Sequence, residues 1–164
     1  MKHTQVLRSS VLAVALLFLA RTVAAQYFGR NKVQYETFDF KVLTTEHFRI
    51  YFYSAERDAA EQAARMAERW YQRLSGILSH QLRGKQPLIL YADHPDFEQT
   101  NIISGEISEA TGGVTESIKR RIVLPLGASL AETDHVIGHE LVHAFQYDIT
   151  GAGDVVLEIG RAHV

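Results

Sequence analysis

The spacing of hydrophobic and polar residues divides the chain into alternating strands and helices. Apolar residues alternate with polar ones over residues 37–43 and cluster over residues 47–53, which predicts two strands joined by a step short enough for a hairpin. Between residues 55 and 78, apolar residues recur every three or four positions. Charged residues fill the remaining positions, so this segment is expected to be a long helix that buries one face.

The second half of the chain is predicted to add three strands and two helices. Strands are expected at residues 87–92, 114–118 and 121–124, a short helix at residues 96–103, and a helix of about 20 residues after residue 129. Ser129 and Glu132 form a capping box at the start of the last helix, and Gly151 supplies a stop. This order predicts an α+β fold, in which a twisted mixed β-sheet packs against both long helices.

The last helix carries the most specific chemical motif, His139-Glu140-Leu141-Val142-His143. Residues four apart lie on one face of a helix, so both imidazoles can reach a single Zn²⁺ ion. Glu140 lies beside the first ligand, where a carboxylate can deprotonate the attacking water. The alternative is an ordinary amphipathic helix with two surface histidines.

The composition of the chain excludes some partners and some metal ligands. The net charge of −2 and the lack of a basic stripe argue against nucleic acid as a partner. The sequence has no cysteine, so disulfides and thiolate metal ligands are excluded, and a metal must be held by His, Asp or Glu.

The N-terminus has the pattern of a signal peptide over residues 1–25. Lys2 and Arg8 precede an apolar run of about 10 residues, which is too short to span a bilayer, and small residues precede Gln26. Cleavage there would export a bacterial protein to the periplasm or cell exterior, with no stable membrane span. The alternative is that the segment is retained as an anchor.

These features together resemble the gluzincin branch of the peptidase MA-like metallopeptidases, whose model is thermolysin. The resemblance is carried by the export signal, the aromatic strand at residues 48–53, the Ala-rich helix and residues 134–146. The lead-in at residues 26–35 is similar to large exported bacterial proteins in which such a lobe precedes a TolB-type β-propeller. The resemblance implies that residues 26–157 are a gluzincin N-terminal lobe.

For the site, the resemblance implies a zinc metallopeptidase that acts on peptide or protein substrates. His139 and His143 would be the zinc ligands and Glu140 the general base. In gluzincins the third ligand is a Glu on a following helix. Metzincins instead have Gly and His where this chain has Gln146 and Ile149, so that reading is excluded.

The sequence after His143 offers few candidates for the third ligand. Glu158 is the only Glu there, and residues 158–164 can be read from a common sequencing-adapter sequence translated in frame. We therefore expect residues 158–164 to be a non-native tail and the catalytic lobe to be truncated. The third ligand is expected beyond this end, and the fragment alone is expected to be inactive.

Residues 112–117 are proposed as a sheet edge that binds an extended peptide by strand addition, although an ordinary hairpin fits equally well. Other polar residues are expected to have structural roles. His135 is placed at the rim of the cleft rather than among the metal ligands, and Asp134 in the first half of its helix, where negative charge is favourable. Arg120 and Arg121 are placed in a solvated turn, with contact to substrate as the alternative. Tyr147 is a minor candidate for an oxyanion donor. Three further histidines are predicted to be surface residues: His47, His80 and His94.

Two other functions fit the sequence. One is a non-catalytic binding or assembly module attached to a β-propeller, because two histidines without a third ligand should bind metal weakly. The other is a zinc hydrolase of non-peptide bonds, which would use the same site.

Overall fold

The computed structural model describes residues 35, 37–102, 107–108 and 110–152. The predicted signal peptide at residues 1–25 and the predicted tail at residues 158–164 lie outside this part of the chain. Within it, no helix combines the length and apolar content that a membrane span requires.

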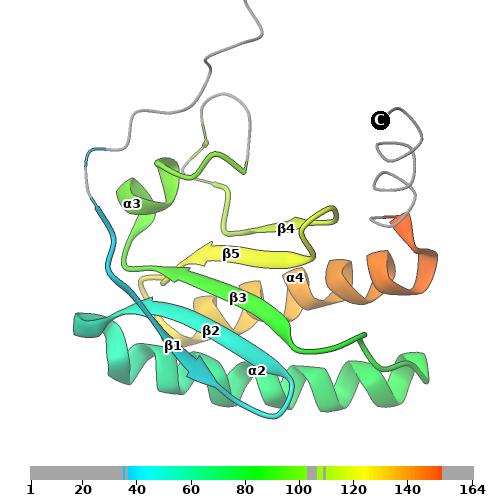
Figure 1. The fold of residues 1–164 in the computed structure, drawn as a ribbon. Helices are drawn as coiled ribbons and strands as arrows, with labels where there is room; N and C mark the ends of the chain where they lie inside the picture. Colours follow the sequence, from blue (N-terminus) through cyan, green and yellow to red (C-terminus); the bar gives the residue numbers. More distant parts are fainter. Residues whose placement is uncertain (1–34, 36, 103–106, 109, 153–164) are drawn as a thin grey trace, which may run out of the picture. The chain divides into compact units, whose positions relative to one another are not determined.

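Five strands form one mixed sheet in the order β1-β2-β3-β5-β4 (Figure 1). Antiparallel pairs, β1 with β2 and β4 with β5, flank a parallel centre made by β2, β3 and β5. The strands are β1 (Phe40–Thr44), β2 (Phe48–Tyr53), β3 (Gln86–Tyr91), β4 (Val114–Glu116) and β5 (Arg121–Pro125). The predicted α+β fold with a mixed sheet is confirmed.

The helices are α2 (Arg57–Leu78), which follows the 3₁₀ turn η2 (Ser54–Glu56), α3 (His94–Glu98) and α4 (Leu130–Thr150). Both ends of α4 follow the prediction. The Ser129 hydroxyl accepts a hydrogen bond from the Glu132 N–H, and Gly151 ends the helix with φ at 66°. The Glu132 carboxylate reaches back to the N–H of Ala128, one residue before the N-cap.

One main core lies between the sheet and the two long helices. Alternate residues of β2, Phe48, Ile50 and Phe52, are buried against α2, and alternate residues of β3 and β5 continue this layer. The main core also contains Ile137, Leu141 and Phe145 of α4. Burial of these apolar side chains is the main force that joins the helices to the sheet.

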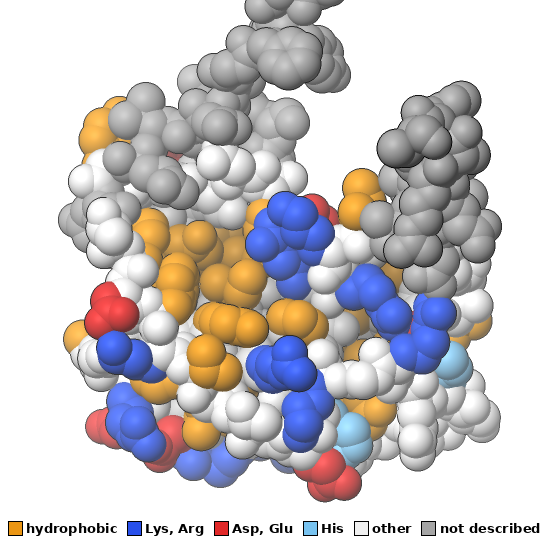
Figure 2. All heavy atoms as spheres, in the orientation of Figure 1, with side chains coloured by type: hydrophobic (Ala, Val, Ile, Leu, Met, Phe, Trp, Pro, Cys, Tyr) orange, Lys and Arg blue, Asp and Glu red, His pale blue; other side chains and the backbone are white. Residues whose placement is uncertain are grey.

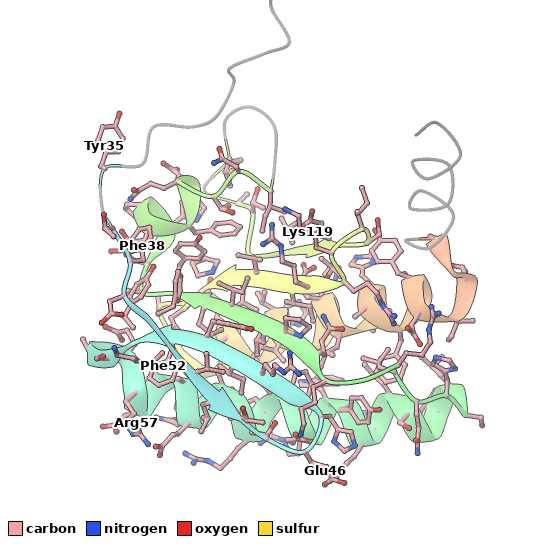
Figure 3. All side chains as sticks on the ribbon, in the orientation of Figure 1. Tyr35, Phe38, Glu46, Phe52, Arg57 and Lys119 are labelled. Carbon is pink, nitrogen blue, oxygen red and sulfur yellow. The ribbon has the colours of Figure 1, made fainter. Side chains whose placement is uncertain are left out.

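The outer face of the sheet is also apolar. Its central row runs in register across all five strands, through Val42, Tyr51, Ile89, Val123 and Val114. Figure 2 shows apolar side chains gathered on this face with Lys and Arg side chains around them. Phe38 adds to the aromatic cluster beside β1, where its ring stacks 5.1 Å from Tyr53 (Figure 3).

Several predicted boundaries are wrong. Strand β1 begins at Phe40 rather than residue 37. The short helix spans His94–Glu98 rather than residues 96–103, since Asp93 caps it through the Asp96 N–H and Pro95 fits its first turn. Strand β4 ends at Glu116 rather than residue 118. The connection to β5 is a turn over residues 117–120 that closes with Arg120 at φ 51°.

The two long helices lie in close contact at Gly138. A Cβ atom on Gly138 would lie 2.6 Å from the Trp70 ring, so only glycine fits. Beside this contact, the Trp70 indole N–H and the Arg69 guanidinium both donate to Asp134, at 3.1 and 2.9 Å. Asp134 therefore joins α4 to α2, a role that its place in the sequence did not indicate.

Gly138→Ala should lower the free energy of unfolding by about 1–3 kcal/mol, because the methyl group would overlap the Trp70 ring. Urea unfolding measures the change. Gly76→Ala is the matched control, since Gly76 lies in α2 with no atom within 4 Å of the added Cβ. The control should be neutral or stabilising by about 0.5–1 kcal/mol. Equal effects of the two substitutions would contradict the close contact.

Candidate metal centre

His139 and His143 lie one turn apart on the same face of α4. Their Nε2 atoms are 3.2 Å apart, and their rings are nearly perpendicular, at 81°. Two nitrogens bound at about 2.05 Å to a tetrahedral Zn²⁺ are about 3.3 Å apart. The pair therefore has the spacing of two ligands to one ion. His139 is exposed and His143 partly exposed, so the metal position would face outward from the helix.

Gln146 orients the second histidine. Its side-chain oxygen lies 3.1 Å from Nδ1 of His143. An amide oxygen only accepts, so Nδ1 must carry the proton, which leaves the lone pair on Nε2 for a metal. Sequence reasoning used Gln146 only to exclude a metzincin. The signal that could have found this contact is its position three residues after a ligand histidine.

Glu140 lies between α4 and the edge of the sheet. The residue is only 5% exposed, and the Thr115 hydroxyl of β4 lies 2.6 Å from its Oε2 atom and 2.9 Å from its backbone oxygen. Because the hydroxyl has one proton, it can donate fully to only one of these oxygens at a time. Thr115 thus holds the carboxylate beside the strand, a contact that sequence reasoning missed.

The glycine before β4 permits this close approach. A Cβ atom on Gly113 would lie 3.0 Å from Val136, 3.1 Å from the Glu140 side chain and 3.2 Å from Leu124. Strand β4 pairs with β5 on one side, and no other described strand pairs with it. The segment proposed from sequence as a peptide-binding edge does lie at a sheet edge, next to Glu140.

The described residues bring together two candidate metal ligands, His139 and His143. They contain no group of three or more His, Cys, Asp or Glu residues that could hold a metal ion. His135 is exposed one turn before His139 and does not complete such a group. Asp148, five residues after His143, is buried and makes ion pairs with His80, Arg83 and Arg120.

The arginines of the predicted solvated turn are ion-paired. Arg120 pairs with Asp148, and the Arg121 guanidinium lies 2.5 Å from the Glu116 carboxylate. Tyr147 lies beside this turn and lines a small hollow with Arg120, and its ring lies 6.3 Å from that of His143. The assignment of Arg120 and Arg121 to a purely solvated turn is therefore wrong.

The prediction that His47, His80 and His94 are plain surface residues is also wrong. The side chains are only 22–30% exposed, and each contacts a carboxylate. The pairs are His47 with Glu68 at 2.7 Å, His80 with Asp148 at 2.7 Å, and His94 with Glu98 at 3.3 Å.

The environment of Glu68 has opposing effects on its pKa. Burial alone raises the pKa of this carboxyl, but hydrogen bonds from Thr45 and from the backbone and ring of His47 outweigh burial and lower it. The His47 ring also stacks on Tyr71 at 3.8 Å. The His47–Glu68 pair joins the β1–β2 turn to α2.

Comparisons with protein-family models, with curated proteins and with solved structures found no match for this chain.

Gln146→Ala should weaken zinc binding about 10-fold, because His143 would lose the acceptor that fixes its tautomer. Gln146→Glu retains an acceptor and should bind zinc nearly as well as the wild type. Competition with a chelating dye measures the affinity, and Ile149→Ala, an exposed position on α4, is the control. Unchanged affinity in Gln146→Ala would contradict the assigned role.

Glu68→Gln should destabilise the protein at neutral pH but not in acid. The lowered pKa means that the charged carboxylate stabilises the fold above its unfolded-state pKa, and that this stabilisation is lost as the pH falls through the folded-state pKa. Urea unfolding is measured from neutral pH to below the folded-state pKa of Glu68. The free energies of unfolding of the wild type and of Glu68→Gln should converge at low pH, whereas that of Glu61→Gln should equal the wild-type value throughout. A difference that does not change with pH would contradict this explanation.

Proposed function

We propose that this chain carries the zinc-binding part of a peptide hydrolase of the gluzincin type. The observation that carries the proposal is the 3.2 Å separation of the His139 and His143 Nε2 atoms. Gln146 supports it by leaving Nε2 of His143 available, and Glu140 lies next to His139 in the chain.

The residues have complementary roles in this proposal. Zinc, when bound by His139 and His143, supplies Lewis acidity toward the scissile carbonyl and the attacking water. Glu140 takes the proton of the attacking water and then delivers it to the leaving amine. Thr115 keeps the Glu140 carboxylate in one orientation, so that little reorganisation is needed during proton transfer.

The sheet edge favours a peptide over other substrates. The backbone of β4 has one side without a partner strand among the described residues, and this strand contacts α4 beside Glu140. An extended peptide can add to such an edge through main-chain hydrogen bonds. Because Gly113 brings the strand against Glu140, a peptide on this edge would pass close to the general base.

The proposal assigns the third protein ligand to a residue outside the described part of the chain, a Glu on a following helix as in gluzincins. Export to the periplasm or cell exterior and attachment to a β-propeller are further parts of the proposal. The described residues contain no group of three His, Cys, Asp or Glu that could hold a metal ion, which favours a second candidate, a binding or assembly module that does not catalyse hydrolysis.

Glu140→Gln should reduce peptide hydrolysis by about 10²–10⁴-fold, the range for a lost general base, and leave zinc bound. His143→Ala should instead remove the zinc. Activity and metal content are measured in the full-length protein and in each variant of it. Glu61→Gln, on the exposed face of α2, is the control.

Hydrolysis by Glu140→Gln at the wild-type rate would contradict the role of Glu140. If the full-length protein neither binds zinc nor cleaves peptides, the non-catalytic module is the better function.

A further inference from the structure

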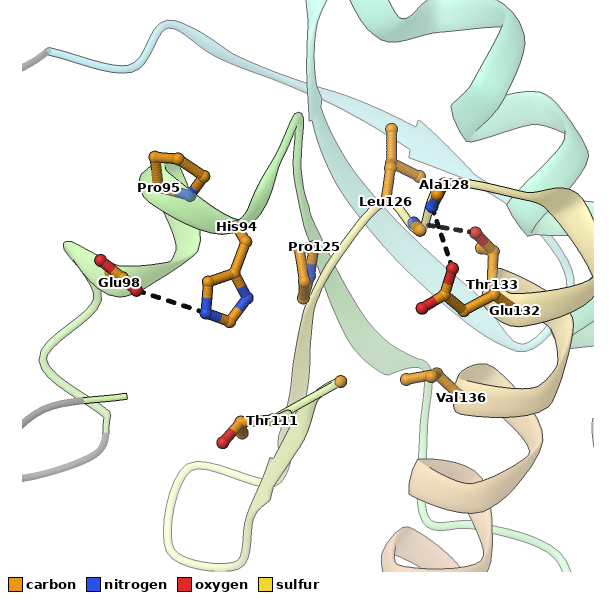
Figure 4. A pocket seen from close by; sticks show the side chains of 12 residues that line it. His94, Pro95, Glu98, Thr111, Pro125, Leu126, Ala128, Glu132, Thr133 and Val136 are labelled. Atoms are coloured by element: carbon orange, nitrogen blue, oxygen red, sulfur yellow. Dashed lines mark hydrogen bonds and ion pairs between the residues drawn. The ribbon is translucent and has the colours of Figure 1, made fainter. Parts of the chain in front are cut away.

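A cavity of about 430 Å³ lies beside the first turns of α4 (Figure 4). Val136 in its wall is one turn before His139, and Gly112 in its wall precedes β4 by two residues. The cavity therefore lies along the same edge and helix as the candidate metal centre. A peptide bound along β4 could place a side chain in it.

The walls of this cavity combine negative charge with apolar surface. Glu98 of α3 and Glu132 of α4 lie on opposite sides of it (Figure 4). Pro125, Leu126 and Val136 supply apolar surface between them. No described residue in the lining is Lys or Arg, and the basic group present there, the His94 ring, lies 3.3 Å from the Glu98 carboxylate.

Both carboxylates are held at the wall by neighbouring groups. The Glu132 Oε2 atom accepts a hydrogen bond from the Ala128 N–H at 3.0 Å. The Glu98 carboxylate lies 3.3 Å from the His94 ring nitrogen, and its side chain is 47% exposed. The position of the Glu132 carboxylate is therefore set before any ligand binds, which reduces the entropy cost of recognising a cation.

We propose that this cavity binds a lysine or arginine side chain, so that peptides with a basic residue near the scissile bond are the preferred substrates. A long aliphatic stem with a cationic end matches apolar walls that carry two carboxylates. This inference rests on the proposed function, because the peptide must lie along β4 to reach the cavity. Aliphatic side chains of the same length would fill the space but leave both carboxylates without a cation.

The direct test compares peptides that differ at one position, which carries lysine, norleucine or glutamate. Norleucine keeps the aliphatic stem and lacks the charge. Binding is measured by fluorescence anisotropy with the Glu140→Gln protein, which should not cleave the peptides. The measurement is repeated with the test residue at successive positions along the peptide. At the best position, lysine should bind about 5-fold more tightly than norleucine, the gain expected from two partly exposed ion pairs.

Glu98→Gln combined with Glu132→Gln should abolish the lysine preference and leave norleucine binding unchanged. Glutamine retains the capping role at position 132, so this variant should fold. The combination of Glu46→Gln and Glu61→Gln, both exposed and outside the cavity, is the matched control.

Equal binding of lysine and norleucine, a preference that survives the double substitution, or no binding of any peptide would overturn the inference. Hydrolysis assays with the wild type separate it from the proposed function. Cleavage of lysine and norleucine peptides with equal kcat/KM would reject the basic preference and retain the hydrolase. Lysine-selective binding without cleavage would retain the cavity assignment and reject the hydrolase.

Discussion

The crossing of α2 and α4 at Gly138 determines where the candidate ligands lie. Gly138 precedes His139 directly, and its missing side chain lets the Trp70 ring lie against the α4 backbone. The same ring donates to Asp134 one turn earlier, so packing and a hydrogen bond act at the same place. With this face of α4 pressed against α2, His139 and His143 are left on an accessible face, where two imidazoles can share an ion.

The other half of α4 is fixed by a buried charge. The Asp148 side chain is 1% exposed and pairs with His80 and Arg83, which follow α2, and with Arg120 from the β4–β5 turn. A buried carboxylate is costly unless it is paired, so these contacts are strongly interdependent. They join the β4–β5 hairpin to α4. Thr115 makes a second connection from the same hairpin, directly to Glu140.

The sequence predicted the parts that depend on local patterns. The cluster of aromatic and β-branched residues at 47–53 identified β2, and the apolar stripe at residues 55–78 identified α2. The i, i+4 spacing placed His139 and His143 on one face. The register of β4 beside Glu140 could not be predicted, because Thr115 and Glu140 are 25 residues apart in the chain. The pairing of His80 with Asp148 spans 68 residues and has no local signal.

The central claim is that His139 and His143 bind one zinc ion through their Nε2 atoms, and nitrogen-15 NMR of the imidazole rings tests it most directly. During titration with Zn²⁺, the account predicts that the Nε2 signals of both residues change together and reach completion at one ion per chain. Nδ1 of His143 should remain protonated, and the signals of His47 and His135 should not move. Independent changes at the two histidines, or binding through Nδ1, would contradict the account.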